Sequence, residues 1–142
     1  MKKNLFVLLG FLVVIVLISA MVYYNYQKKL ILSKKANSEF NEYTSQEITG
    51  SALMTLINKV SDQNEKNGVQ KGEKNRYIEN GKDSIKIEVK FLESDEIYVM
   101  EAISNLGSEK FIKNYNNMKF RCTKIAYHEK TNKIKYMLFE QI

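Results

Sequence analysis

The first part of the chain is a single run of apolar residues. From Leu5 to Tyr24 the sequence contains twenty residues without a charged side chain. At 1.5 Å per residue, a helix of this length spans about 30 Å, which is the thickness of the hydrocarbon core of a bilayer. We therefore expect residues 5–24 to form a transmembrane anchor, with residues 1–4 as a short N-terminal tail.

A cleaved signal peptide is the alternative interpretation of this segment. Lys2 and Lys3 form a basic start, and Ala20 has the small side chain that signal peptidase accepts before its cleavage site. The apolar run is longer than the roughly 7–15 residues of a signal peptide's hydrophobic region, and Ile18 is a poor residue at position −3. The pattern favours an uncleaved anchor.

Lysines flank the anchor on both sides, so charge alone does not fix its orientation. Lys2 and Lys3 precede it, and four lysines follow it between residues 28 and 35. A basic start, an apolar segment and a C-terminal domain make the usual signal-anchor layout, which favours a cytoplasmic N-terminus and an extracytoplasmic domain. In the opposite orientation the four lysines would lie against the anionic inner leaflet.

The periodicity beyond the anchor predicts an amphipathic stalk helix over residues 25–43. Apolar and aromatic residues recur there at steps of three and four, with two polar residues interrupting the stripe. Tyr26, Leu30 and Phe40 lie between the anchor and the domain, and no other segment obviously covers them. We predict that they bind another membrane or envelope protein, or a second copy of the chain.

A helix is predicted at the start of the domain, which we place at residues 44–142. The sequence Thr44-Ser45-Gln46-Glu47 has the form of a capping box, which marks a helix start. The polar stretch of residues 62–75, with its two glycines, predicts a solvated loop. The expected core face of the helix consists of Ile48, Leu53, Leu56, Ile57 and Val60.

A first hairpin is predicted after this loop. Residues 85–91 alternate apolar and charged positions, which indicates a strand with one buried face. Asn80-Gly81 is a hairpin signal that pairs this strand with residues 77–78, and the chain is expected to turn at residues 93–96.

A helical region and a second hairpin complete the predicted domain. The helical region is broken near Gly107, and Ser108 is expected to cap its second part. Residues 118–128 pair with residues 134–141, with a bulge near Thr123-Lys124. The predicted fold is α+β: a transmembrane helix extended into a stalk, then helix-strand-strand-helix-strand-strand with a four-stranded antiparallel sheet.

The net charge of +6 belongs to the flanks of the anchor and not to the domain. The six lysines beside the apolar segment account for the whole excess and leave sixteen basic residues against sixteen acidic ones. A neutral domain whose only arginines are Arg76 and Arg121 lacks the cation density that binds a phosphate backbone, so we expect no nucleic-acid partner.

Charge is unevenly distributed within the domain. Six basic residues lie between positions 119 and 135, where Glu129 is the one acid, whereas residues 93–101 carry four acids and no base. Such charges are most often solvated strand and turn positions. The functional alternative is a surface that meets anionic lipid, an envelope polymer or the acidic end of another copy. The residues assigned to this surface are Lys119, Arg121, Lys124, Lys133 and Lys135.

No catalytic, cofactor-binding or metal-binding residue is predicted. Cys122 and His128 are the only cysteine and histidine, but on one strand they would lie about 20 Å apart, so we expect a packed cysteine and a histidine at the hairpin end. The acids of residues 93–96 lack the spacing of a calcium loop. The chain also lacks the phosphate-loop, dinucleotide, serine-hydrolase and zinc-protease motifs.

Two resemblances point to the cell envelope. An apolar N-terminal helix, a stalk and an antiparallel sheet resemble type IV pilin-like proteins, and Gly10-Phe11 followed by LVVIVLI is similar to the start of a mature pilin helix. Leu8 and Leu9 stand where a prepilin has basic residues. The segment Ile48-Thr49-Gly50 opening LMTLINKV is similar to helices of small single-pass envelope proteins of Gram-positive bacteria without assigned activity.

The expected function is a non-enzymatic, membrane-anchored interaction or assembly module of the cell envelope. A pilin-like subunit and a membrane-tethered enzyme with a site built from scattered residues are the alternatives. Exposed apolar patches on the stalk would favour assembly, and a deep pocket with converging polar groups would favour the enzyme.

Overall fold

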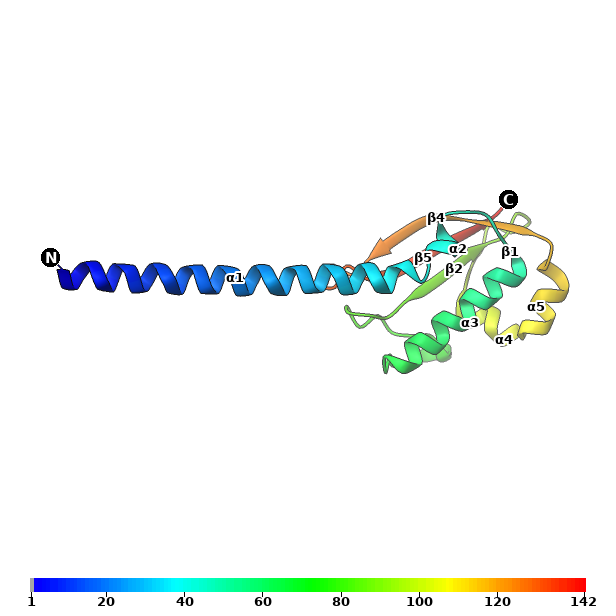
Figure 1. Ribbon diagram of the computed structural model, residues 1–142. Coiled ribbons are helices and arrows are strands. Elements are labelled where there is room, and N and C mark those ends of the chain that lie inside the picture. The colour runs from blue at the N-terminus through cyan, green and yellow to red at the C-terminus, as the bar shows by residue number, and fades with distance from the viewer. Residues whose placement is uncertain (1) are drawn as a thin grey trace.

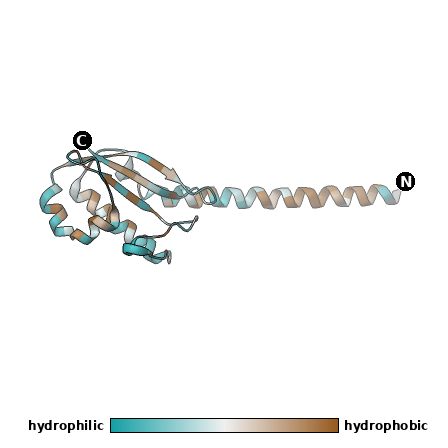
Figure 2. Cartoon of the chain, turned by 180° about the vertical axis from the view of Figure 1, so that it is seen from behind, coloured by the Kyte–Doolittle hydropathy of each residue, from teal (hydrophilic) through white to brown (hydrophobic). Residues whose placement is uncertain are grey.

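The anchor segment and the first part of the stalk form one uninterrupted helix, α1 (Lys2–Ser38), which stands out from the rest of the chain (Figure 1). The computed structural model describes residues 2–142, so Met1 of the predicted tail lies outside the described residues, as do the side chains of Lys2 and Lys3. Within the described part, α1 is the one helix long and apolar enough to cross a membrane, and its apolar window is 0% buried (Figure 2).

The domain beyond α1 consists of short helices on a sheet. Three helices, α3 to α5, lie together on one face of the sheet (Figure 1). In chain order the elements are α2 (Asn41–Thr44), β1 (Ile48–Thr49), α3 (Gly50–Lys66), a 3-10 turn η1 (Glu73–Asn75), β2 (Lys86–Lys90), β3 (Ile97–Val99), α4 (Met100–Leu106), α5 (Ser108–Tyr115), β4 (Lys119–Tyr127) and β5 (Ile134–Gln141).

The sheet has five strands in the order β1-β4-β5-β2-β3, and it is mixed. β2 runs parallel to β5, and the other three pairings are antiparallel. The predicted α+β class is confirmed, whereas the predicted four-stranded antiparallel sheet and its strand order are wrong. The second hairpin, β4 with β5, forms as expected, with its bulge between Cys122 and Lys124.

The first predicted hairpin does not form, because the residues after Asn80 satisfy their hydrogen bonds locally. The Asn80 side-chain oxygen accepts from the backbone N–H groups of Lys82, Asp83 and Ser84. This folds the loop onto itself, and Tyr77 makes a single bridge with Lys71 instead. β2 therefore pairs with β3 across the turn at residues 91–96, and with β5 on its other side.

The helix α3 begins at Gly50, later than the capping-box pattern predicts. The Thr49 hydroxyl caps it by accepting from the N–H of Ala52, 3.3 Å away. Ser45 instead closes α2 by donating to the carbonyl of Asn41, and Ile48 lies in β1, paired with Phe120. The helix also extends to Lys66, into the stretch predicted as a loop. Four residues of its predicted core face are confirmed as fully buried: Leu53, Leu56, Ile57 and Val60.

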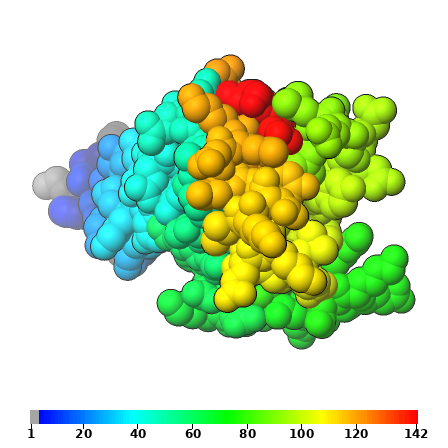
Figure 3. Space-filling model, turned by 90° about the vertical axis from the view of Figure 1, so that its right-hand side faces the viewer, coloured from blue at the N-terminus to red at the C-terminus, as the bar shows by residue number. Residues whose placement is uncertain are grey.

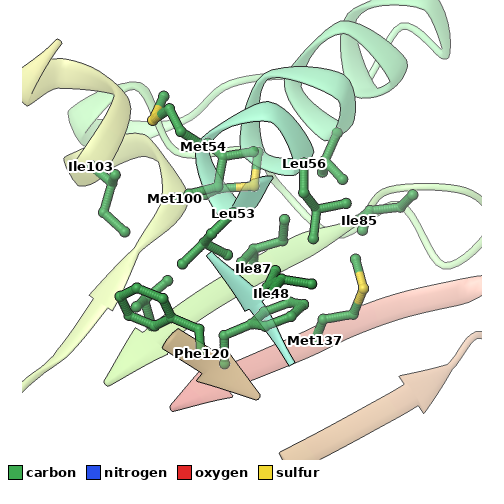
Figure 4. Packing of buried hydrophobic residues seen from close by; sticks show 14 of the residues in the cluster. Ile48, Leu53, Met54, Leu56, Ile85, Ile87, Met100, Ile103, Phe120 and Met137 are labelled. Carbon is green, nitrogen blue, oxygen red and sulfur yellow. The ribbon is translucent and has the colours of Figure 1, made fainter. Parts of the chain in front are cut away.

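The core lies between the helix layer and the sheet (Figure 4). Ile85, Ile87 and Val89 point into it, which confirms the alternation expected for this strand. The helical region breaks at Gly107 as predicted, but Gly107 with φ +87 is itself the residue before α5, and Ser108 is the first residue inside the helix.

The domain has two distinct ends. The α1 end comprises residues 80–86 and 127–134, beside α1. The far end, residues 91–98, 106–120 and 141–142, lies opposite, where α5 and the C-terminus are found (Figures 1 and 3). β4 runs from the far end to the α1 end, and β2 and β5 run the other way.

Candidate functional site

The junction between α1 and the domain is built on one asparagine side chain. The Asn37 amide nitrogen donates to the carbonyl of Asn132 at 2.8 Å, and its amide oxygen accepts from the N–H of Ile134 at 2.9 Å. The Asn37 side chain thus makes the two hydrogen bonds that the backbone of a neighbouring strand would make at the start of β5. Since both side-chain atoms are used, this contact ties the end of α1 to the β4–β5 turn and to β5.

The stripe predicted for partner binding divides at this junction. Phe40 is 2% exposed and belongs to the domain's own core, with the Lys59 ammonium 5.4 Å from its ring centre. Ser33 is also buried, and its hydroxyl donates to the carbonyl of Leu30. Phe40 is therefore corrected from a partner contact to a core residue, because α1 ends at Ser38 and the ring packs into the core cluster of the domain.

The part of the stripe nearer the anchor remains accessible. Tyr26 is exposed and Leu30 is half-buried. Two residues that the periodicity did not single out, Ile31 and Leu32, are 64% and 54% exposed. We call Tyr26, Leu30, Ile31 and Leu32 the stalk surface. In the sequence, the stalk surface is indicated by the apolar residues 30–32, which lie between two pairs of lysines.

Comparison of the chain with protein-family models, with curated proteins and with solved structures gave no match.

The basic residues assigned to an anionic-surface contact differ in their ion pairing. Lys119 and Arg121 lie at the far end and share Glu47, to which Arg121 donates a hydrogen bond that holds the pKa of this carboxyl below its usual range. Lys135 lies 3.7 Å from Glu79. Within the described residues, Lys124 and Lys133 make no ion pair, and the anionic-surface contact stays a prediction for all five residues.

A cleft of about 340 Å³ at the α1 end brings polar groups together. Its Lys86 lies 2.6 Å from a Glu88 oxygen, and the Tyr136 hydroxyl donates to the other oxygen at 2.7 Å. Burial raises the pKa of Glu88, but these two donors outweigh it and the net pKa is lowered. Burial and the bond to Glu88 raise the pKa of Tyr136. Lys86, Glu88 and Tyr136 thus bind one another, whereas Lys124, which also lines the cleft, makes no ion pair with any described side chain.

Cys122 and His128 lie in separate environments. Cys122 is half-buried, its thiol lies 3.6 Å from the carbonyl of Lys124, and burial raises the pKa of the thiol. His128 is buried at the end of the β4–β5 hairpin, with Nε2 2.7 Å from the carbonyl of Ser84. The histidine therefore joins the β4–β5 turn to the start of β2.

The acidic residues of the turn between β2 and β3 are exposed. Glu93, Asp95 and Glu96 lie at the far end, and Glu96 donates its N–H to the hydroxyl of Ser94. No group of three or more metal-ligating side chains from His, Cys, Asp and Glu occurs in the part of the chain that the structure describes.

Proposed function

We propose that this protein is a non-enzymatic, membrane-anchored interaction module of the cell envelope, which binds a partner protein through its stalk surface. α1 crosses the membrane with its N-terminus in the cytoplasm, and the domain stands outside. The observation that carries the proposal is the exposure of Ile31 and Leu32 on a helix whose end the Asn37 contact ties to the domain.

The position of these residues along α1 supports a protein partner rather than lipid. Ile31 lies about 10 Å beyond Tyr24 along the helix axis. The polar layer adds only about 5–8 Å on each side of the hydrocarbon core, so Ile31 and Leu32 extend past the lipid of an upright helix. Adjacent exposed apolar side chains at this height are suited to packing against a second helix.

The non-enzymatic part of the proposal is supported by the cleft at the α1 end. Most of the ionisable groups there are engaged in the Lys86–Glu88–Tyr136 chain and the Lys135–Glu79 pair, and among the residues that the structure describes Lys124 is the lining lysine without an ion pair. A catalytic group needs an unengaged lone pair or proton that faces the substrate, and these contacts use the groups within the protein.

Replacing both Ile31 and Leu32 with serine is expected to abolish crosslinked complexes of the full chain in native membranes. Both side chains are exposed, so the thermal midpoint of the domain should stay unchanged. The control is Ile78→Ser, which removes a comparably exposed apolar side chain from the domain, outside the stalk surface. Complexes that persist in the stalk variant, or that disappear equally in the control, would contradict the stalk contact.

A cysteine introduced at the exposed position Gln70, in a Cys122→Ser background, is expected to react with a membrane-impermeant maleimide added to intact cells. Gln70 lies in the loop after α3, remote from the α1 junction in sequence, so the label should not disturb the anchor. The measurement is the mass shift of the protein before and after lysis. Labelling only after lysis would place the domain in the cytoplasm.

A further inference from the structure

The far end of the domain contains a second cleft, about 400 Å³ in volume and lined mainly by aromatic and aliphatic side chains. It is formed where the β2–β3 turn, α4, α5 and the C-terminal strand meet, the face seen in Figure 3. We call it the far-end cleft. Its lining residues include Phe91, Tyr98, Phe111, Tyr115, Leu106 and Met118.

Phe91 is the centre of the aromatic wall. Its ring centre lies 4.7 Å from that of Tyr115 and 5.4 Å from that of Tyr98, which it meets edge to face. Behind it, Phe111 and Phe120 are buried in the core. The wall is therefore rigid and already formed, and a ring or aliphatic side chain entering the cleft would find aromatic edges and faces without any rearrangement.

The rim of the far-end cleft is apolar and unusually open to solvent. Leu106, at the end of α4, is 57% exposed, and Leu92, next to the aromatic wall, is 68% exposed. Met118 is also exposed, and its sulfur accepts from the side-chain amide of Gln141 at 3.0 Å. A flexible methionine and two leucines around a hollow form a surface that can adapt to an apolar partner.

Acidic side chains stand beside this rim. Glu93 lines the cleft, and Asp95 lines a smaller hollow that shares Phe91 with it. Together with Glu96 they form no ion pair within the described part of the chain. Their charge gives this turn a local negative potential that attracts cations, with Lys90, among the described residues, as the one lysine that lines the same smaller hollow as Asp95.

We propose that the far-end cleft binds a large apolar side chain of a partner protein, carried on a segment with neighbouring lysine or arginine residues. The apolar side chain would enter between Phe91 and Leu106, and the flanking cations would meet Glu93 and Asp95. Electrostatic complementarity of this kind sets the choice of partner, and the buried apolar side chain supplies affinity.

The occupant is a different protein and not a neighbouring copy in the same membrane. The chain does carry an apolar basic segment, residues 28–35, but it lies on α1 at the opposite end of the domain. Copies anchored side by side hold their stalks at one height and their far ends at another, so neither reaches the other. The proposal is also independent of the stalk surface.

The test uses the full chain in nanodiscs of neutral phosphatidylcholine, with the fluorescent peptide Lys-Lys-Phe-Leu-Lys-Lys as the probe. We expect saturable binding by anisotropy that weakens as salt is raised, and about fivefold weaker binding for Glu93→Lys or Leu106→Ser. Matched controls are Glu73→Lys and Ile78→Ser, which change an exposed acid and an exposed apolar residue outside the cleft and should leave binding within about twofold.

A second measurement uses the unaltered chain, so its result does not depend on whether a variant folds. A peptide with benzoylphenylalanine in place of phenylalanine should crosslink to residues 91–118. Crosslinks elsewhere, equal binding of Glu-Glu-Phe-Leu-Glu-Glu, absence of saturable binding, or equal losses in the control variants would overturn the proposal.

Discussion

Replacing Asn64 with alanine is expected to lower the free energy of unfolding of the domain by about 3 kcal/mol. Asn64 lies in the last part of α3 and is 0% exposed. Its amide nitrogen donates to the carbonyl of Ile85 and its oxygen accepts from the N–H of the same residue, both at 2.8 Å. Alanine would leave a buried backbone donor and a buried acceptor without partners, next to a small cavity.

The measurement is urea unfolding followed by far-ultraviolet circular dichroism, since the chain contains no tryptophan. Asn67→Ala provides the matched control, because Asn67 makes one hydrogen bond, to the carbonyl of Asp83, and is only half-buried. The control should lose about 1 kcal/mol or less. If Asn64→Ala loses no more unfolding free energy than the control, the two hydrogen bonds between α3 and the start of β2 contribute little to stability.

Replacing Gly50 with alanine is expected to destabilise the domain by a similar amount, about 3 kcal/mol, through overpacking. A Cβ atom at this position would lie 2.0 Å from the carbonyl oxygen of Tyr115 and 2.6 Å from its carbonyl carbon. Both are backbone atoms at the end of α5, so α3 and α5 would have to move apart. The same urea experiment measures the loss.

Gly72→Ala is the control for this change. The nearest atom to its added methyl group is the end of the Ile78 side chain, 3.1 Å away, which can rotate aside. We expect this variant to stay within about 0.5 kcal/mol of the unaltered chain. Equal effects at the two glycines would show that the approach of α3 to α5 is not a tight constraint.

Patterns that repeat along the chain were readable from sequence. The apolar run gives α1, helical spacing gives the buried face of α3, and alternation gives β2. What the sequence did not reveal are elements too short to carry a period. β1 has two residues and β3 has three, and both are defined by their partners in the sheet. The parallel contact of β2 with β5 joins segments nearly fifty residues apart.

The candidate sites were harder to predict from the sequence, because they too depend on contacts between segments that lie far apart in the chain. The helical period placed Phe40 on an uncovered stripe, because nothing local shows that α1 ends at Ser38 and turns that ring into the core. Arg121 looked free for an anionic surface, but it meets Glu47, which lies beside it because β1 pairs with β4. The far-end cleft draws its walls from residues 91–141, and only the fold brings them together.

The Asn37 contact has a mechanical consequence. A helix in a bilayer changes its tilt when the thickness of the hydrocarbon core changes. Because both amide atoms of Asn37 are bound to the β4–β5 turn and β5, such a tilt would pull on the domain at this turn, at the end of α1. With an arm as long as the 37 residues of α1, roughly 55 Å, a change of about 10° moves its end by about 10 Å. A change in bilayer thickness would then reach the domain at the β4–β5 turn.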